Sequence, residues 1–324
     1  MLLWSTIFII TLVSLVIAAD FFIKAAERIG LALGIEPFIV GVTLIAVGTS
    51  LPELVTSIVA VLKPSGTSAI VPGNVIGSNI TNTCLVLGIV GVLAKKVRLE
   101  FDIMQVDLPM LMGSAFIMYL CCMDAYFSLF EGIICLGGLV MYLMYVLSLG
   151  RNGSDSPSPG DGGDGANAAE SNLPQFSIKD PLILLASGLV IYFSAEYNVT
   201  AIIEISEMLD IGKELIALTA VALGTSLPEL VVSVVAVRSG NAEMAIGNIL
   251  GSNIFNVFAV MGIPRLFGLI DVPPSILDFS LPAMIVASLI ALLIVQDRIV
   301  NRWEGFILLL LYVLFMGNLI GMQI

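Results

Sequence analysis

The chain has 324 residues, of which 58% are hydrophobic and 12% are charged, and its mean hydropathy is +1.07. Soluble globular domains carry about 25% charged residues, so this composition excludes a cytosolic enzyme, a disordered protein and a nucleic-acid-binding protein. The net charge of −12 also disfavours nucleic acid as a partner, and the absence of histidine excludes a histidine-ligated metal.

Ten apolar segments follow one another along the chain, and each is long enough, or nearly so, to cross the membrane as a helix. None shows the alternation that membrane-spanning strands require. We therefore expect an all-α membrane protein with ten transmembrane helices. The expected spans are residues 2–26, 38–62, 70–94, 105–122, 127–149, 181–206, 214–238, 242–268, 279–296 and 302–322.

The first segment is expected to remain as a helix. No basic residue precedes it and Lys24 and Arg28 follow it, whereas a signal peptide carries its positive charge in front. The four cysteines lie in or beside apolar runs without CxxC spacing, and we expect them to pack as small apolar side chains. They are Cys84, Cys121, Cys122 and Cys135.

One hydrophilic segment divides the chain. It contains Ser-Pro repeats and a Gly-Asp-Gly-Gly-Asp-Gly stretch, and it has almost nothing apolar to bury. We expect residues 151–178 to form a disordered linker between a first domain, 1–150, and a second, 179–324. The single Gly/Asp stretch also faintly resembles a calcium-binding repeat, but one short copy is weak evidence for such a site.

Two sequence motifs occur once on each side of this linker. Gly-Thr-Ser-Leu-Pro-Glu-Leu occupies residues 48–54 and again 224–230, and Gly-Asn-Val-Ile-Gly-Ser-Asn-Ile at 73–80 returns as Gly-Asn-Ile-Leu-Gly-Ser-Asn-Ile at 247–254. The order and spacing match, which indicates an internal duplication. Because each half holds five expected spans, an odd number, the halves should have opposite orientations in the membrane. Such inverted repeats are typical of transporters whose site lies at the midplane.

The distribution of basic residues predicts the orientation. With the N-terminus outside, the loops on the inner side carry ten of the 13 Lys and Arg residues and the outer loops carry three. Cytoplasmic loops are enriched in Lys and Arg. We therefore expect both termini outside and the linker in the cytoplasm.

The first motif places a carboxylate in the middle of a span. Pro52 lacks an N–H, so we expect the helix to break near Gly48 and expose carbonyls over residues 46–49, close to the Thr49 and Ser50 hydroxyls. Glu53 adds a charge that is expensive in a bilayer. In the second half, the corresponding residues are Gly224, Thr225, Ser226, Pro228 and Glu229.

The partner of these two glutamates is expected to be a cation, because no Lys or Arg lies near mid-span. Two carboxylates match one Ca²⁺ or two Na⁺. Two bidentate glutamates and two threonine carbonyls would supply about six oxygens, which suits Ca²⁺ better than Mg²⁺. An alternative interpretation is structural, since Ser50 and Glu53 also have the spacing of a helix capping box.

The second motif supplies neutral oxygens. Ser78 and Asn82 are four residues apart and share one helical face, and Ser252 and Asn256 repeat this arrangement. We expect both asparagines to contribute to the site. The glycines of the motif are expected mainly to allow close helix packing.

The two motifs together resemble the α-repeats of the cation/calcium exchanger superfamily, and most closely the prokaryotic sodium/calcium exchangers. This resemblance implies that Glu53 and Glu229 are ligands shared by Ca²⁺ and Na⁺, that Thr49 and Thr225 give carbonyls to Ca²⁺, and that Asn82 and Asn256 occupy the middle position. It implies two flanking Na⁺ sites, lined by Ala46, Thr49, Ser50 and Ser78 in one case and by Ala222, Thr225, Ser226 and Ser252 in the other.

The resemblance further implies a function. The chain would be an antiporter, not an enzyme, that exchanges Na⁺ for Ca²⁺ by alternating access. Spans one and six lack the motifs, and we expect them to form the pair that slides past the rest. Three Na⁺ for one Ca²⁺ would make exchange electrogenic. No prosthetic group is implied, and we expect a monomer in a prokaryotic plasma membrane.

Other couplings remain open at this point. Potassium-dependent relatives, and some sodium/calcium exchangers, carry Asp where this chain has Asn256. Proton/calcium relatives usually lack the first motif. A cation channel is the third alternative, and stimulation of flux by the opposing ion would separate it from an exchanger.

Overall fold

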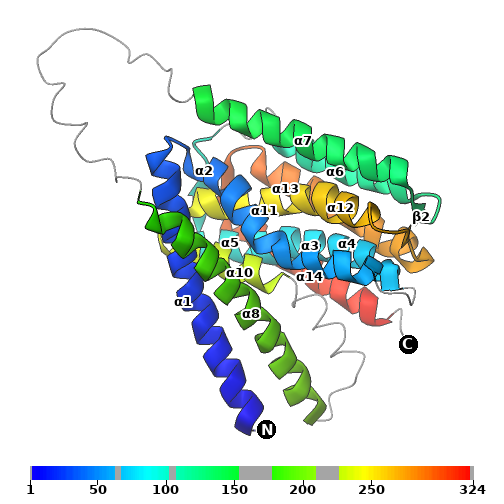
Figure 1. Ribbon diagram of the computed structural model, residues 1–324, viewed down its shortest axis with the longest axis horizontal. Coiled ribbons are helices and arrows are strands. Elements are labelled where there is room, and N and C mark those ends of the chain that lie inside the picture. The colour runs from blue at the N-terminus through cyan, green and yellow to red at the C-terminus, as the bar shows by residue number, and fades with distance from the viewer. Residues whose placement is uncertain (1, 63–66, 102–106, 153–176, 209–225, 322–324) are drawn as a thin grey trace, which may run out of the picture.

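The protein is described here by a computed structural model, which covers residues 2–62, 67–101, 107–152, 177–208 and 226–321. The polypeptide in these ranges is almost entirely helical (Figure 1). The α-helices are α1 (Leu2–Ala32), α2 (Pro37–Val40), α3 (Ala46–Leu62), α4 (Ile70–Ile80), α5 (Leu87–Ala94), α6 (Asp107–Cys122), α7 (Leu129–Asn152), α8 (Lys179–Met208), α10 (Leu227–Arg238), α11 (Ala242–Phe255), α12 (Met261–Arg265), α13 (Leu281–Val295) and α14 (Arg302–Gly321).

Several of these helices are joined end to end by wider, π-helical turns. The π-helical segments are η1 (Gly41–Ile45), η3 (Thr81–Val86), η5 (Asn256–Val260) and η6 (Ile276–Ser280), and a short 3₁₀ helix is η2 (Thr67–Ala69). The four strands are β1 (Lys96–Arg98), β2 (Tyr126–Phe127), β3 (Ile270–Asp271) and β4 (Ile299–Asn301).

Eight helical runs among the described residues are long and apolar enough to cross a membrane, and they coincide with eight of the ten expected spans. The other two expected spans are shorter where they are described. The span expected at 105–122 is the 16-residue helix α6. The span expected at 214–238 is described only from Ser226 onward, with α10 beginning at Leu227. The linker expected at 151–178 lies largely outside the described residues.

One expectation about the first motif is wrong. Residues 37–62 form a continuous helix through Pro52, not a helix broken at Gly48. The irregularity lies one turn earlier, in η1, where the N–H of Ala46 bonds back to the Gly41 carbonyl. Widening of a turn lets a helix lose regular hydrogen bonds without ending. The matching residues of the second half, 214–225, lie outside the described residues.

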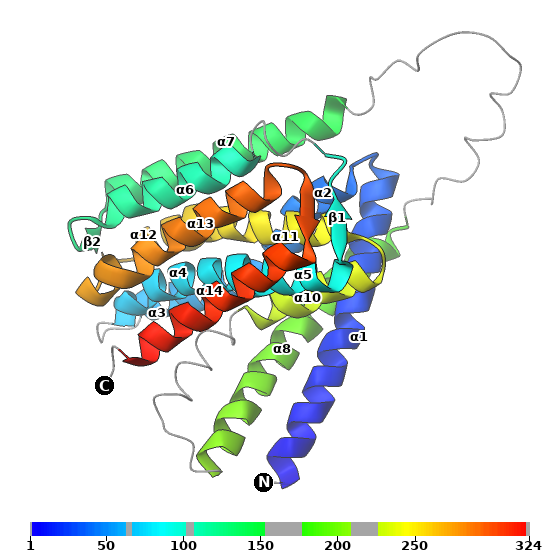
Figure 2. The same cartoon turned by 180° about the vertical axis from the view of Figure 1, so that it is seen from behind.

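Helices α1 and α8 form a pair that slants across one end of the bundle (Figures 1 and 2). Their contacts require antiparallel directions. Arg28, near the end of α1, pairs with Asp180 at the start of α8 at 2.7 Å, whereas Asn198 late in α8 donates to the Phe8 carbonyl early in α1 at 3.1 Å. The two helices that the repeat aligns therefore run in opposite directions.

Two short antiparallel strand pairs join the first half of the chain to the second. β1 pairs with β4, and β2 pairs with β3. Lys95, Ala125 and Arg298 have positive φ angles, and each directly precedes a strand, so the chain leaves its helix or turn through a left-handed residue. The labelled strands β1 and β2 lie at opposite ends of the helix bundle (Figure 2).

The motif-bearing helices form the interior. Of the hydrophobic windows, the one in α11–α12 is 89% buried and the one in α4–α5 is 78% buried. Glycine permits the closest approach: a Cβ at Gly247 would overlap the Phe38 carbonyl, and one at Gly251 would overlap the Val42 carbonyl. The packing role expected for these two glycines is confirmed.

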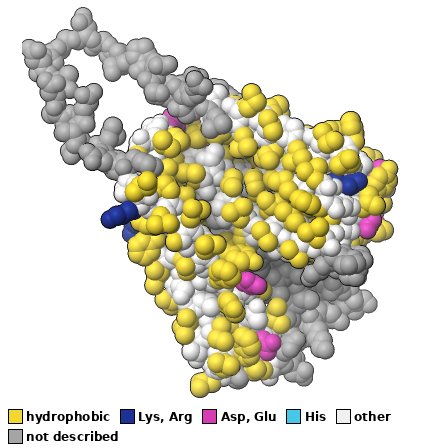
Figure 3. All heavy atoms as spheres, in the orientation of Figure 1, with side chains coloured by type: hydrophobic (Ala, Val, Ile, Leu, Met, Phe, Trp, Pro, Cys, Tyr) yellow, Lys and Arg dark blue, Asp and Glu magenta, His cyan; other side chains and the backbone are white. Residues whose placement is uncertain are grey.

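The outer surface is largely apolar. Figure 3 shows hydrophobic side chains over most of the face in that view, with few charged groups between them. Large side chains such as Leu185, Leu310 and Phe130 are 67%, 70% and 71% exposed. A lipid bilayer is the medium that favours such a surface. All four cysteines are free and buried, as expected.

Candidate functional site

The two motif glutamates meet in the interior of the bundle. Glu53 on α3 and Glu229 on α10 are both completely buried. Their carboxyl groups are close enough for their charges to interact. The Ser50 hydroxyl of the first half donates to Glu229 Oε1 of the second half at 3.1 Å. Glu53 and Glu229, which lie 176 positions apart in the sequence, therefore form one cluster with Ser50.

Most of this cluster consists of polar atoms without a protein partner. Eleven buried side-chain polar atoms lack a hydrogen bond among the described residues, and nine of them belong to the motifs or to the two asparagines that follow. These nine atoms are Glu53 Oε1 and Oε2, Asn74 Oδ1, Asn82 Oδ1 and Nδ2, Ser226 Oγ, Glu229 Oε2, Asn253 Oδ1 and Asn256 Oδ1. Buried polar groups are otherwise almost always paired, so a concentration of acceptors indicates a ligand site.

The Thr49 side chain connects the first motif to the second motif of the other half. Its hydroxyl donates to Asn248 Oδ1 at 3.2 Å and lies 3.5 Å from the Ser252 hydroxyl. It also faces the Glu229 carboxylate. Ser252 in turn lies 3.5 Å from the Ala46 carbonyl oxygen. The structure thus brings Ser252 to Ala46 and Thr49, although the resemblance groups Ser252 with the other flanking site.

The remaining predicted ligands are distributed as follows. Ser78 and Asn82 are buried on α4 and η3, and Asn256 is buried at the start of η5. Ser226 is buried immediately before α10. Ala222 and Thr225 lie outside the described residues. The grouping of these residues into separate ion sites stays a prediction.

The capping-box interpretation of the first motif does not fit either half. Ser50 lies inside the continuous helix α3 and directs its hydroxyl to Glu229, so it does not cap a helix. Ser226 stands at the N-cap position of α10 but makes no capping hydrogen bond with its side chain. Both serines therefore present their hydroxyls to the polar cluster or leave them without a described partner.

Sequence reasoning missed a pair of supporting contacts that is present in both halves. Asn74 donates to the Ser57 hydroxyl at 3.4 Å, and Asn248 donates to the Ser233 hydroxyl at 3.0 Å. Each contact ties the second-motif helix to the first-motif helix of the same half. A signal existed, because each serine lies four residues after a motif glutamate and so shares its helical face.

The oxygen atoms of this cluster are ligands suited to hard cations. Among the described residues there is no group of three or more His, Cys, Asp or Glu side chains that could hold a metal ion. The cluster instead combines two carboxylates with neutral hydroxyl, amide and carbonyl oxygens. Oxygen ligands of this kind suit Ca²⁺ and Na⁺, whereas zinc and copper prefer nitrogen and sulfur.

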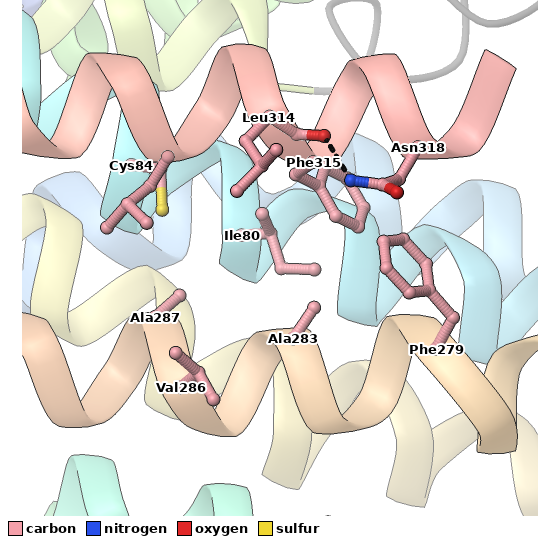
Figure 4. Close-up of a pocket in the computed structure, with 10 residues that line it drawn as sticks. Ile80, Cys84, Phe279, Ala283, Val286, Ala287, Leu314, Phe315 and Asn318 are labelled. Atoms are coloured by element: carbon pink, nitrogen blue, oxygen red, sulfur yellow. Dashed lines mark hydrogen bonds between the residues drawn. The ribbon is translucent and has the colours of Figure 1, made fainter. Parts of the chain in front are cut away.

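Two apolar cavities lie away from this cluster. One, of about 170 Å³, is bounded by α13, α14, η6 and the junction of α4 with η3, and Figure 4 shows Cys84 and Phe279 facing it. Its amide, Asn318, is satisfied by the Leu314 carbonyl at 2.9 Å. The other, of about 390 Å³, lies between α1 and α8. Neither is lined by a predicted ligand.

Comparison with known proteins gives a consistent picture. The family model for the sodium/calcium exchanger protein matches residues 3–150 and 179–321. The chain is 35% identical to the sodium/calcium exchanger MaX1 of Methanosarcina acetivorans, over 96% of each chain. It is 30% identical to the inner membrane protein YrbG of Escherichia coli, over 92% of this chain and 90% of that one.

Solved structures of the sodium–calcium exchanger NCX_Mj resemble the fold as a whole. One of them, from crystals soaked with 2.5 mM Na⁺ and 0.1 mM Ca²⁺, superposes with a TM-score of 0.79 at 27% identity, covering 97% of this chain and 98% of that one. The likeness therefore extends over both halves and is not confined to the motifs.

Proposed function

Because this chain belongs to the sodium/calcium exchanger protein family, we propose that it is a secondary antiporter that exchanges Na⁺ for Ca²⁺ across a membrane. One observation carries the proposal for this chain's own residues. Two fully buried glutamates, one from each half, meet in a cluster of unpartnered oxygens. Ionised carboxylates in such a place need a compensating cation. The ions are transported substrates, and the reaction requires neither a prosthetic group nor covalent chemistry.

The proposed ligands are the residues predicted from the sequence. Glu53 and Glu229 serve both ions in turn, and the Thr49 and Thr225 carbonyls complete the Ca²⁺ site. Neutral oxygens carry the Na⁺ ions, with Asn82 and Asn256 in the middle. The flanking groups are Ala46, Thr49, Ser50 and Ser78 on one side, and Ala222, Thr225, Ser226 and Ser252 on the other.

The proposed topology has ten spans in two inverted repeats, residues 1–150 and 179–324. The antiparallel α1 and α8 support the inversion. The strand pairs support it too, because the strand that follows the second-motif helix of each half pairs with a strand late in the other half. We place both termini outside, the linker 151–178 in the cytoplasm and the protein, as a monomer, in the plasma membrane.

The mechanism we propose is alternating access. Ca²⁺ and Na⁺ compete for overlapping oxygens, so one excludes the other. Binding moves the inward–outward equilibrium only through different affinities for the two states. An empty site would leave two like charges in a low dielectric, which opposes crossing without ions. With three Na⁺ against one Ca²⁺, exchange is electrogenic, and α1 and α8 form the sliding pair.

The test is Na⁺-gradient-driven ⁴⁵Ca²⁺ uptake into proteoliposomes. Uptake should require Na⁺ inside the vesicles and should accelerate when a K⁺–valinomycin potential makes the interior positive, because each cycle exports one net positive charge. Uptake driven by a pH gradient without Na⁺ would indicate proton coupling, and a requirement for internal K⁺ would indicate potassium co-transport. Equal Ca²⁺ flux without any opposing ion would indicate a channel.

A further inference from the structure

A chain of three hydrogen bonds crosses between the two halves beside the glutamates. Asn253 Nδ2 donates to Thr83 Oγ1 at 2.8 Å, and Asn79 Nδ2 donates to the Asn253 backbone carbonyl at 3.2 Å. Asn256 Nδ2 then donates to Asn79 Oδ1 at 3.2 Å. All four residues are at least 96% buried. Of them, only Asn256 belongs to the predicted ligand set.

A backbone carbonyl fixes which atoms donate and which accept in these three hydrogen bonds. An amide side chain can usually be turned either way, with its oxygen and nitrogen exchanged. A backbone carbonyl only accepts, so Asn79 must turn its NH₂ group toward Asn253. Its Oδ1 therefore faces Asn256, and the NH₂ group of Asn256 must donate to it. Asn256 Oδ1 is left pointing elsewhere, completely buried and without a hydrogen bond among the described residues.

The matching asparagine of the first half is held differently. Asn82 occupies the equivalent place in η3, yet neither its Oδ1 nor its Nδ2 has a partner among the described residues. The repeat therefore predicts two equivalent amides, whereas the structure contains one oriented amide and one that no described side chain orients. η5, which begins with Asn256, packs against α3, which carries Glu53.

We propose that Asn79 is a positioning residue, which holds the Asn256 side chain with its carbonyl oxygen toward the transported ions and its NH₂ group away from them. This inference rests on the proposed function. It explains why Asn, and not Asp, suits position 256 in this chain. A carboxylate there would set a charged acceptor against Asn79 Oδ1, whereas the amide offers a donor. The buried charge of the site then stays with Glu53 and Glu229 alone.

The experiment measures the Na⁺ concentration that half-saturates exchange for Asn79→Ala, Asn256→Ala and the double variant. Loss of an oriented oxygen ligand should raise this concentration about fivefold in each single variant, the effect of one hydrogen-bond-sized contribution. Maximal turnover of Asn79→Ala, whose side chain is not a proposed ligand, should change less than twofold. If Asn79 acts through Asn256, the double variant should match Asn256→Ala. Asn79→Ala combined with Asn82→Ala should instead give the product of the two separate effects.

Two further variants separate positioning from general structural damage. Asn79→Asp offers the same donor and acceptor only while its carboxyl group is protonated, so at a pH below the pKa of the new acid half-saturation should return to within twofold of wild type. Thr83→Val removes a buried hydrogen bond of the same chain but leaves the Asn79–Asn256 contact, so it should lower the melting temperature without moving half-saturation. An unchanged half-saturation in Asn79→Ala, or multiplicative effects in the Asn79/Asn256 pair, overturns the proposal.

A second measurement does not depend on transport: the Na⁺ concentration that gives half of the Na⁺-induced rise in melting temperature of the purified protein. This concentration should rank the variants in the same order as the half-saturating Na⁺ concentration of exchange. If wild type binds Na⁺ by this measure but fails to exchange it for Ca²⁺, the proposed function is wrong while the role of Asn79 can still be judged. If Asn79→Ala does not fold, Asn79→Asp and the Asn256→Ala comparison carry the test, and a shifted half-saturation in Asn79→Asp at that pH contradicts the proposal.

Discussion

Two long apolar segments of the second half have the same mean hydropathy and opposite surroundings. The window in α8 is 28% buried, whereas the window in α11–α12 is 89% buried. One belongs to the slanting pair at the edge of the bundle, and the other runs through its middle (Figure 1). Hydropathy therefore identifies a membrane span without saying whether it faces lipid or protein.

The hydrogen-bond partners of the polar side chains differ between the two segments. In α8, Ser187 and Thr200 donate to carbonyls of their own helix, at 2.6 Å and 3.0 Å. In α11–α12, Asn248 and Asn253 donate to other helices. A Ser or Thr hydroxyl readily bonds a carbonyl of its own helix, whereas a buried amide, with two donors and an acceptor, commonly bonds across helices. Asparagine-rich spans are therefore the interior ones.

The largest expected effect on transport comes from removing a charge from the interior, and it would test the contrast between interior and edge helices. Glu53→Gln and Glu229→Gln should each abolish Na⁺-driven ⁴⁵Ca²⁺ uptake. Removing one charge from a buried, compensated group typically costs about 3–5 kcal/mol, which is at least about 100-fold in affinity. Both variants should also lose the Ca²⁺-induced gain in the free energy of unfolding, which for wild type reaches about 2.7 kcal/mol when the Ca²⁺ concentration is about 100 times Kd.

A matched control lies at the start of the helical run that carries Glu53. Glu36 directly precedes α2, is exposed and makes no capping hydrogen bond with its side chain. Glu36→Gln should keep uptake and Ca²⁺ stabilisation within twofold of wild type. Uptake above about a tenth of the wild-type rate in either Glu53→Gln or Glu229→Gln would remove these carboxylates from the mechanism.

The duplicated motifs were sufficient to predict which residues meet, because two charges in a bilayer must share a partner. They predicted that Glu53 and Glu229 share a site, and the structure buries both and places the Ser50 hydroxyl against Glu229. The division of the hydroxyls into two flanking ion sites stays a prediction. They did not predict the continuous helix through Pro52. Loss of one N–H frees one carbonyl, and whether the helix then breaks depends on the neighbouring turn, which here widens into η1 where α11 packs against it.

The hydrogen bonds between the two halves also could not be predicted from the sequence. Asn79 and Asn253 stand at equivalent positions of the second motif and Thr83 lies three residues beyond it, but their hydrogen bonds join residues about 170 positions apart. Repeat symmetry would give each half the same bonds. The symmetry fails here because residue 257, the counterpart of Thr83, is a valine without a hydroxyl. Such differences decide amide orientation, and only the packed structure reveals them.

A second variant tests the close packing of the interior helices by pushing two of them apart. Gly251→Ala places a Cβ against the Val42 carbonyl, where neither backbone can yield without shifting α11. Overpacking of this kind typically costs about 1–3 kcal/mol, and we expect a lower melting temperature and reduced exchange. Gly137→Ala on exposed α7, where a Cβ meets nothing within 4 Å, should leave both unchanged. Equal melting temperatures for the two variants would contradict the close packing of α11 on η1.

The smallest effect is expected in the slanting pair, at the one amide of α8 that reaches another helix. Asn198 donates to the Phe8 carbonyl at 3.1 Å and to the Thr11 hydroxyl at 3.0 Å, and it is 2% exposed. Interhelical hydrogen bonds in membranes average about 0.6 kcal/mol, so Asn198→Leu should lower the melting temperature slightly. Leu185→Ala, on the exposed face of the same helix, serves as the control. If α1 and α8 slide as one unit, Asn198→Leu should slow turnover while leaving the half-saturating Na⁺ and Ca²⁺ concentrations unchanged. The reason is that the hydrogen bonds of this amide among the described residues reach α1 and none of the proposed ligands. A shift in half-saturation would place α8 in the binding site instead, and the division between a binding interior and a moving edge would fail.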